Sequence, residues 1–178
     1  QPNVQESKDS TKAYLEEFKK MGALPKEEPV LKVDGIELYA DKKNAADLKA
    51  KASRSPFPKE SLESYLHAHF ARVKKGDYAA FNAYVEMNAA NHKALQAIRV
   101  TVRDTKKVAT TVGFGPRFLH STGQLHKGGP DSGVFTQITC DDPVDLAIPG
   151  EKFTFGVLKQ AQALGDFQCL AKRDRRLL

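Results

Sequence analysis

The sequence predicts an α/β fold that is rich in helices and has a small sheet with a glycine-rich loop. Apolar residues recur at helical spacing over much of the chain, and two short apolar runs, 108–112 and 133–139, are typical of strands. A helical stretch follows the second run, and this order of elements is typical of α/β proteins. With 178 residues, of which 40% are hydrophobic, the chain can bury a sizeable core.

The first third of the chain predicts a helix and then a short hairpin. Residues 9–21 place their apolar side chains on one helical face and end at Gly22, a residue that commonly terminates helices. Asp34-Gly35 separates two short apolar runs and supplies the positive φ that a two-residue hairpin turn over 30–39 requires. We expect this hairpin to pack on helices or join a sheet, because an isolated pair of strands is only marginally stable.

The middle of the chain predicts four helices. A short polar helix covers 44–52, and a second helix begins at Ser61 and ends at Gly76. Asp77 is expected to cap the third, and Asn88 or Asn91 to begin the fourth. The apolar residues of these last two helices are Tyr78, Phe81, Tyr84 and Val85, and Leu95, Ile98 and Val102.

After Lys107 the pattern changes from helical to mixed. The two predicted strands enclose a glycine-rich loop, 113–133, which holds six of the twelve glycines. An acidic loop, 141–151, then leads to a final helix at about 154–169 and a basic end. Because long loops without secondary structure usually have a function, we expect the glycine-rich loop to be functional.

Charge and composition exclude several classes of protein. The net charge is +6, but most basic residues alternate with acids on predicted helices, which argues against nucleic-acid binding. Between Asp104 and Asp131 there is no acid at all, an imbalance that suits a small anion. No apolar stretch could span a membrane, and no signal peptide is visible, so we expect a cytoplasmic protein with Cys140 and Cys169 reduced.

The glycine-rich loop carries polar side chains of every hydrogen-bonding kind. Its backbone N–H groups could also form an anion-binding nest. The spacing excludes a dinucleotide fingerprint, a P-loop and a nucleophile elbow. His120 and His126 have no thiol or carboxylate between them, so we expect neither a metal nor another cofactor. His67 and His69 are expected to be structural. The candidate residues of the loop are Arg117, His120, Ser121, Thr122, Gln124, His126 and Lys127.

The start of the chain resembles the end of a signature found in glucose-6-phosphate isomerases, Phe-Asp-Gln-x-Gly-Val-Glu-x-x-Lys. Gln1, Val4 and Lys8 match the signature residues, whereas Asn3 and Gln5 replace its glycine and glutamate. Two later runs, 115–130 and 153–166, look like the C-terminal part of bacterial bifunctional transaldolase/glucose-6-phosphate isomerase proteins. The resemblance covers essentially all 178 residues.

The resemblance implies a sugar-isomerase-like α/β architecture in three segments. Residues 1–22 would be the tail of an upstream isomerase domain, 23–58 a hairpin and connecting segment, and 59–178 a C-terminal α/β domain. The implied partners are a sugar phosphate, glucose 6-phosphate or fructose 6-phosphate, and upstream isomerase and transaldolase domains. A homo-oligomer is compatible with the resemblance, while nucleic acid and membrane are not expected as partners.

The implied reaction is aldose–ketose isomerisation through ring opening and an enediol. Lys8 would assist at the ring oxygen, and His126 or His120 would be the ring-opening acid or base, since histidine titrates near neutrality. Gln1, Arg117, Ser121, Thr122, Gln124 and Lys127 would bind substrate. The family's proton-transferring Glu lies in a Glu-Ser-Thr/Asn-Gly-Lys run that is absent here, so we expect the isolated chain to be inactive. The alternative is a non-catalytic anion-binding or assembly module.

Overall fold

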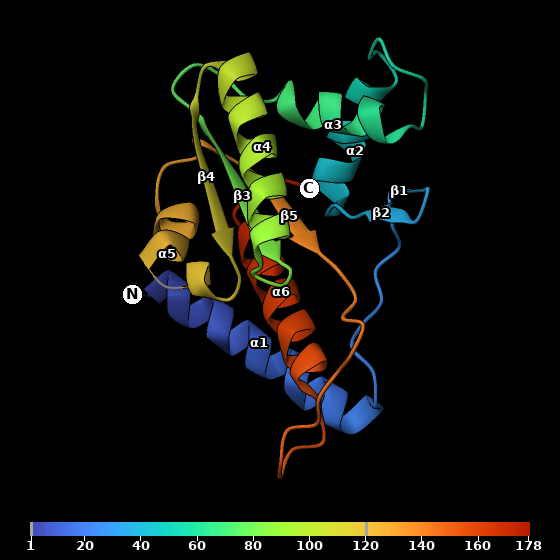
Figure 1. The fold of residues 1–178 in the computed structure, drawn as a ribbon, viewed down its shortest axis with the longest axis vertical. Coiled ribbons are helices and arrows are strands. Elements are labelled where there is room, and N and C mark those ends of the chain that lie inside the picture. Colours follow the sequence, from blue (N-terminus) through green and yellow to red (C-terminus); the bar gives the residue numbers. More distant parts are fainter. Residues whose placement is uncertain (1, 120) are drawn as a thin grey trace.

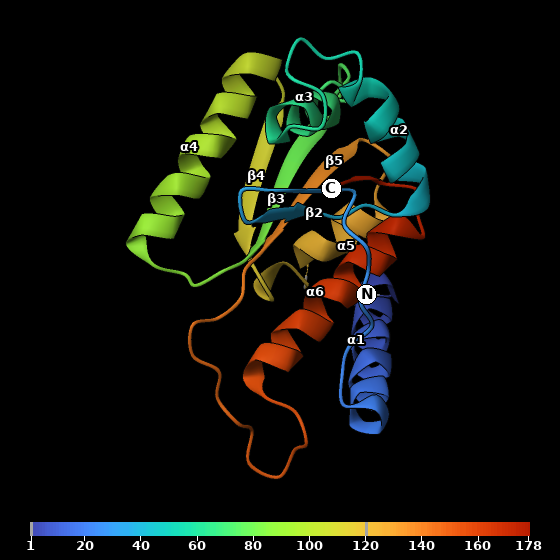
Figure 2. The same cartoon turned by 90° about the vertical axis from the view of Figure 1, so that its right-hand side faces the viewer.

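The computed structural model describes residues 2–119 and 121–178 and has an α/β fold, as the sequence predicts. A four-stranded parallel sheet has the order β4-β3-β5-β6, where β3 is Tyr78–Tyr84, β4 Ala109–Phe114, β5 Gly133–Thr139 and β6 Arg176–Leu177. Helix α4 (Ala89–Lys106) covers one face of the sheet. Helices α1 (Pro2–Met21), α5 (Ser121–Gly128) and α6 (Phe155–Ala171) lie on the other face (Figures 1 and 2).

The predicted third helix, beginning at Asp77, is wrong: this segment forms the central strand β3. It pairs with β4 on one side and β5 on the other, and every residue from Ala79 to Tyr84 is buried. A strand that is covered on both faces does not alternate between polar and apolar residues. Its aromatic residues, spaced by three, therefore resemble a helical pattern.

The glycine-rich segment 113–133 is also not the continuous loop that the sequence predicts. It contains a 3-10 turn, η1 (Arg117–Leu119), and the two-turn helix α5. Glycine is required where the chain turns after β4, since a Cβ on Gly115 would lie 2.6 Å from the Tyr84 ring. Within α5, a Cβ on Gly123 would lie 2.4 Å from Phe118 O. These two glycines therefore serve close packing, and their presence hides the helix from an interpretation based on composition.

Helix α1 begins earlier than predicted and packs along α6. The contact is close because Gly165 has no side chain: a Cβ there would lie 2.9 Å from Thr11 Oγ1 and 3.2 Å from Ser7 O. Ser7 and Thr11 are correspondingly buried. Residues 1–22, which the resemblance assigns to an upstream domain, therefore pack against the third segment through the described part of α1.

The hairpin and the remaining helices follow the sequence, except that the helix predicted to end at Gly76 already ends at Phe70. Strands β1 (Leu31–Val33) and β2 (Ile36–Leu38) pair antiparallel, with φ values of 49° at Asp34 and 76° at Gly35. Helices α2 (Lys42–Ala52) and α3 (Leu62–Phe70) enclose a small core beneath this hairpin. The predicted caps Ser61 and Asn88 each accept a backbone hydrogen bond at a helix start, from Ser64 N and Asn91 N.

The described part of the chain, residues 2–119 and 121–178, includes no helix both long and apolar enough to cross a membrane. Cys140 is exposed, Cys169 is buried, and both are free.

Candidate functional site

The sheet topology indicates where a ligand would bind. The chain passes from β3 to β4 on one side and then crosses to β5 on the other, so the strand order reverses between β3 and β5. In open parallel sheets, ligands bind outside the carboxyl ends of the strands near such a reversal. The turn 115–118, which follows β4, lies at this end of the sheet, and a pocket lies on each side of it.

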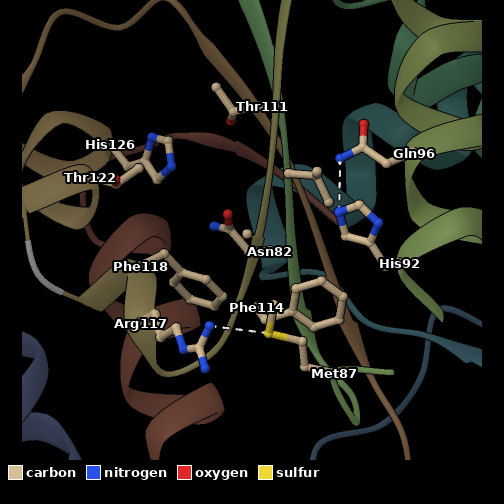
Figure 3. Close-up of a pocket in the computed structure, with 12 residues that line it drawn as sticks. Asn82, Met87, His92, Gln96, Thr111, Phe114, Arg117, Phe118, Thr122 and His126 are labelled. Atoms are coloured by element: carbon tan, nitrogen blue, oxygen red, sulfur yellow. Dashed lines mark hydrogen bonds between the residues drawn. The ribbon is translucent and has the colours of Figure 1, made fainter. Parts of the chain in front are cut away.

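The first pocket has a volume of about 320 Å³ and is lined by β3, β4, η1, α5 and α4, whose His92 and Gln96 lie across β4 from Thr122 and His126 (Figure 3). Asn82 of β3 points to the same sheet face as Tyr78, because alternate residues of a strand share a face. Gly113 is its register partner on β4. The other lining residues are Met87, His92, Gln96, Thr111, Val112, Phe114, Arg117, Phe118, Thr122 and His126.

His126 is the most constrained of the predicted site residues. It is only 3% exposed, and its Nδ1 lies 2.8 Å from Tyr78 Oη. Burial, and then the charge of Lys127, lower the pKa of His126 to about 4, while burial raises the pKa of Tyr78 to about 12. The phenol is therefore protonated at pH 7, and Nδ1 is the acceptor available for its proton. This leaves the hydrogen of the neutral ring on Nε2.

Asn82 is a pocket residue that the sequence does not mark, because its segment has the apolar spacing of a helix. It is 2% exposed, and its Nδ2 has no hydrogen-bond partner within residues 2–119 and 121–178; the same is true of His126 Nε2. A buried polar group without a partner costs about 1–3 kcal/mol of folding free energy. Both groups line the same pocket (Figure 3).

Arg117 and Thr122 complete the predicted residues of this pocket. Both are exposed, at its mouth, where Arg117 Nη1 lies 3.1 Å from Met87 Sδ. The Arg117 guanidinium has no carboxylate partner in the described part of the chain, so it can bind an anion. The pocket therefore combines neutral hydrogen-bonding groups inside with a cation at its mouth.

The second pocket, of about 410 Å³, lies between α1, α6 and the turn after β4. Lys8 and Lys12 contribute cations to it, Pro116 lines it from the turn, and neither lysine has an acidic partner among the described residues. Lys19, further along α1, is bound instead to Glu16 and Glu151. Lys8 and His126 thus lie on opposite sides of the same turn, in separate pockets.

The start of α1 lies directly against α5. Asn3 N donates to Gln124 Oε1 at 3.2 Å, which satisfies one of the free N–H groups in the first turn of α1. Gln124 therefore serves the contact between the two helices rather than either pocket. Ser121 is exposed at the beginning of α5. The predicted residues Gln1 and His120 lie outside the described residues.

Lys127 lies inside the protein and faces neither pocket. Its side chain is 0% exposed and forms an ion pair with Asp166 of α6, which also accepts from Ser7 Oγ at 3.4 Å. Burial raises the pKa of Asp166, and Lys127 opposes this shift. Since the Lys127 ammonium is held by Asp166, the geometry favours a structural role over the substrate-binding role that we expected from the sequence.

His69 has the structural role that its place in the sequence predicts. It is buried, bonded to Arg72, and its Nε2 lies 3.1 Å from Thr136 Oγ1. Burial lowers its pKa as well. Within the residues that the structure describes, no group of three or more histidine, cysteine, aspartate or glutamate side chains could hold a metal ion.

The low pKa of His126 predicts acid sensitivity. An unfolded histidine has a pKa of about 6.5, so between pH 6.5 and 4 the unfolded state binds more protons and stability falls as the pH is lowered. With these two pKa values, His126 accounts for a loss of about 2 kcal/mol at pH 5 relative to pH 7. Urea unfolding at the two pH values should show a correspondingly smaller loss in His126→Phe. An equal loss in both proteins would contradict the assignment.

Comparisons with known proteins support the fold. No family model matches this chain, and none of the curated proteins matches it. A crystal structure of a hypothetical protein, TT0462 from Thermus thermophilus, is similar, with a TM-score of 0.53 and 19% identity. The similarity covers 75% of this chain but only 37% of the Thermus chain, and it supports the α/β fold alone.

Proposed function

We propose that this chain is the C-terminal part of a glucose-6-phosphate isomerase and forms one wall of its sugar-phosphate site. One observation carries the proposal: the two segments that resemble the isomerase, 1–8 and 115–130, are far apart in sequence but adjacent in space. The hydrogen bond from Asn3 N to Gln124 Oε1 joins them. The pocket lined by Lys8 and the pocket lined by His126 lie on either side of the turn 115–118.

The groups in the first pocket suit the first part of the reaction. Ring opening of a pyranose needs a hydrogen-bond donor or acid near the ring oxygen and an acceptor near the C1 hydroxyl. His126 offers the Nε2 hydrogen of a neutral imidazole from a buried position. Arg117, at the mouth of the same pocket, is a cation without an acidic partner in the described part of the chain, and it can bind the phosphate.

The second part of the reaction requires a carboxylate that moves a proton between C2 and C1. The described residues of the pockets do not supply it: no acid lines the first, and in the second Glu16 and Glu151 are bound to Lys19. In the proposed function this carboxylate comes from the upstream isomerase domain. We therefore expect the 178-residue chain to bind sugar phosphate without converting it, as a coupled assay for fructose 6-phosphate would show.

Calorimetric titration tests the binding part of the proposal. We expect glucose 6-phosphate to bind at least about tenfold more tightly than glucose or inorganic phosphate, and Arg117→Met to weaken its binding at least about tenfold. Arg54→Met removes an exposed cation from the α2–α3 connection and serves as the matched control, with unchanged affinity. No binding of glucose 6-phosphate, or equal losses in the two variants, would overturn the proposal.

A further inference from the structure

The inner part of the first pocket contains an amide that the fold does not use. Asn82 Nδ2 is buried and has no partner within the described ranges. His126 Nε2 is in the same condition and lines the same pocket (Figure 3). Buried polar groups in native proteins are nearly always hydrogen-bonded, so two such groups in one pocket indicate a ligand.

We propose that Asn82 is a substrate-binding residue, whose amide acts with His126 Nε2 to bind one hydroxyl group of the sugar. The inference rests on the proposed function for the identity of the ligand as a sugar phosphate. No motif in the sequence marks Asn82, and its place in the centre of the sheet makes it a rigid part of the site.

The hydrogen-bonding chemistry identifies the bound group as a hydroxyl. Tyr78 Oη donates to His126 Nδ1, so Nε2 carries a hydrogen and needs an acceptor. The Asn82 amide offers two donors and one acceptor. A hydroxyl oxygen can accept from Nε2–H and at the same time exchange a hydrogen bond with the amide, in either direction.

The residues beside Asn82 bound the part of the pocket where this group would lie. Gly113 is the register partner of Asn82 on β4, and it faces the same side of the sheet. The Phe118 ring packs over Gly113, since its Cδ1 would lie 3.3 Å from a Cβ there, and the ring lines the pocket together with the amide. On the other strand, Gln137 Nε2 donates to Ala163 O at 3.0 Å and is held on α6.

The arrangement along the pocket distinguishes a sugar phosphate from simpler ligands. The hydroxyl-binding groups lie inside, where burial excludes water, and the Arg117 guanidinium lies at the exposed mouth. Inorganic phosphate would engage only the mouth, and glucose only the interior. A phosphorylated sugar can engage both.

The substitution Asn82→Leu tests the inference, because leucine has nearly the same shape and no polar atoms. If the amide serves a ligand, its removal relieves an unpaired buried group, and the midpoint of thermal unfolding rises by about 2–4 °C. The affinity for glucose 6-phosphate falls at least about tenfold in the same variant. Asn44→Leu is the control: Asn44 Nδ2 donates to Arg175 O at 2.9 Å, and its Oδ1 accepts from Leu177 N at 3.2 Å, so this variant should be less stable.

The outcomes separate the two proposals. A lower midpoint in Asn82→Leu would show that the fold uses the amide, for example through Gln137 Oε1, and would overturn the inference. If Asn82→Leu binds glucose 6-phosphate as tightly as the wild type, the role of Asn82 is also overturned, but the proposed function is not affected. In the wild-type protein, the NMR signals of the Asn82 side-chain amide should shift with glucose 6-phosphate. A shift with glucose but not with glucose 6-phosphate would support the hydroxyl site and contradict the proposed function. No shift with either sugar would contradict both the inference and the proposed function.

Discussion

Replacing Lys127 by methionine is expected to lower the free energy of unfolding by about 3–5 kcal/mol. The Lys127 ammonium and the Asp166 carboxylate are both buried and neutralise each other between α5 and α6. Without the lysine, Asp166 must remain charged in the interior or take up a proton, and its remaining partner, Ser7, compensates little of that cost. The loss should be visible as a lower midpoint in urea.

Two further variants make this prediction specific. Lys43 forms an ion pair with Asp174 at 2.8 Å on the surface, so Lys43→Met should change the free energy by less than about 1 kcal/mol. The double variant Lys127→Met/Asp166→Leu removes both buried charges and should recover much of the loss. If Lys127→Met costs no more than Lys43→Met, the ion pair does not stabilise the contact between these helices.

In the longer isomerase that we propose, His126→Phe should reduce turnover of glucose 6-phosphate by about 10²–10³-fold, the loss expected for one buried hydrogen-bond donor. Phenylalanine retains the ring contacts to Phe135 and Tyr78 but has no hydrogen to donate to the sugar. Turnover should be measured well below the unfolding temperature of the variant, since Tyr78 loses its acceptor. A reduction in turnover without loss of the folded state would show that this segment contributes to catalysis.

The control for this prediction is His67→Phe, a histidine of α3 whose ring meets Phe57 away from both pockets. It should leave turnover unchanged. If His126→Phe loses activity only in proportion to lost folded protein, the segment is a packing element, as in the alternative of a non-catalytic module. Full activity in a folded His126→Phe protein would contradict the role of His126.

Local signals predict much of the fold. The structure confirms the features that depend on residues close by in the sequence. These are the Asp34-Gly35 turn, the caps Ser61 and Asn88, and the strand 133–139. The helix predicted in place of β3 is wrong because the burial of β3 on both faces comes from elements that follow it in the chain. The two-residue strand β6 was not predicted, since its pairing with β5 depends on tertiary contacts.

The site residues differ in the same way: some are marked by their neighbours in the sequence, and others depend on residues far along the chain. Arg117, Thr122 and His126 are recognisable because they lie within one polar, glycine-rich run, and the structure brings them to one pocket. The burial of Lys127 depends on Asp166, which no local pattern connects to it. Asn82 could have been found only by recognising its strand as central, because a polar residue there stands out among buried apolar neighbours.

The central claim, that the pocket lined by Asn82, Arg117, Thr122 and His126 binds a sugar phosphate, is tested most directly by NMR titration of the chain with a sugar-phosphate enediol mimic. We expect saturable shifts at Asn82, Arg117, Thr122 and His126 with a common dissociation constant, but not at Lys8, which lines the second pocket. A well-dispersed spectrum that does not change at these residues up to millimolar concentrations of the mimic would contradict the claim.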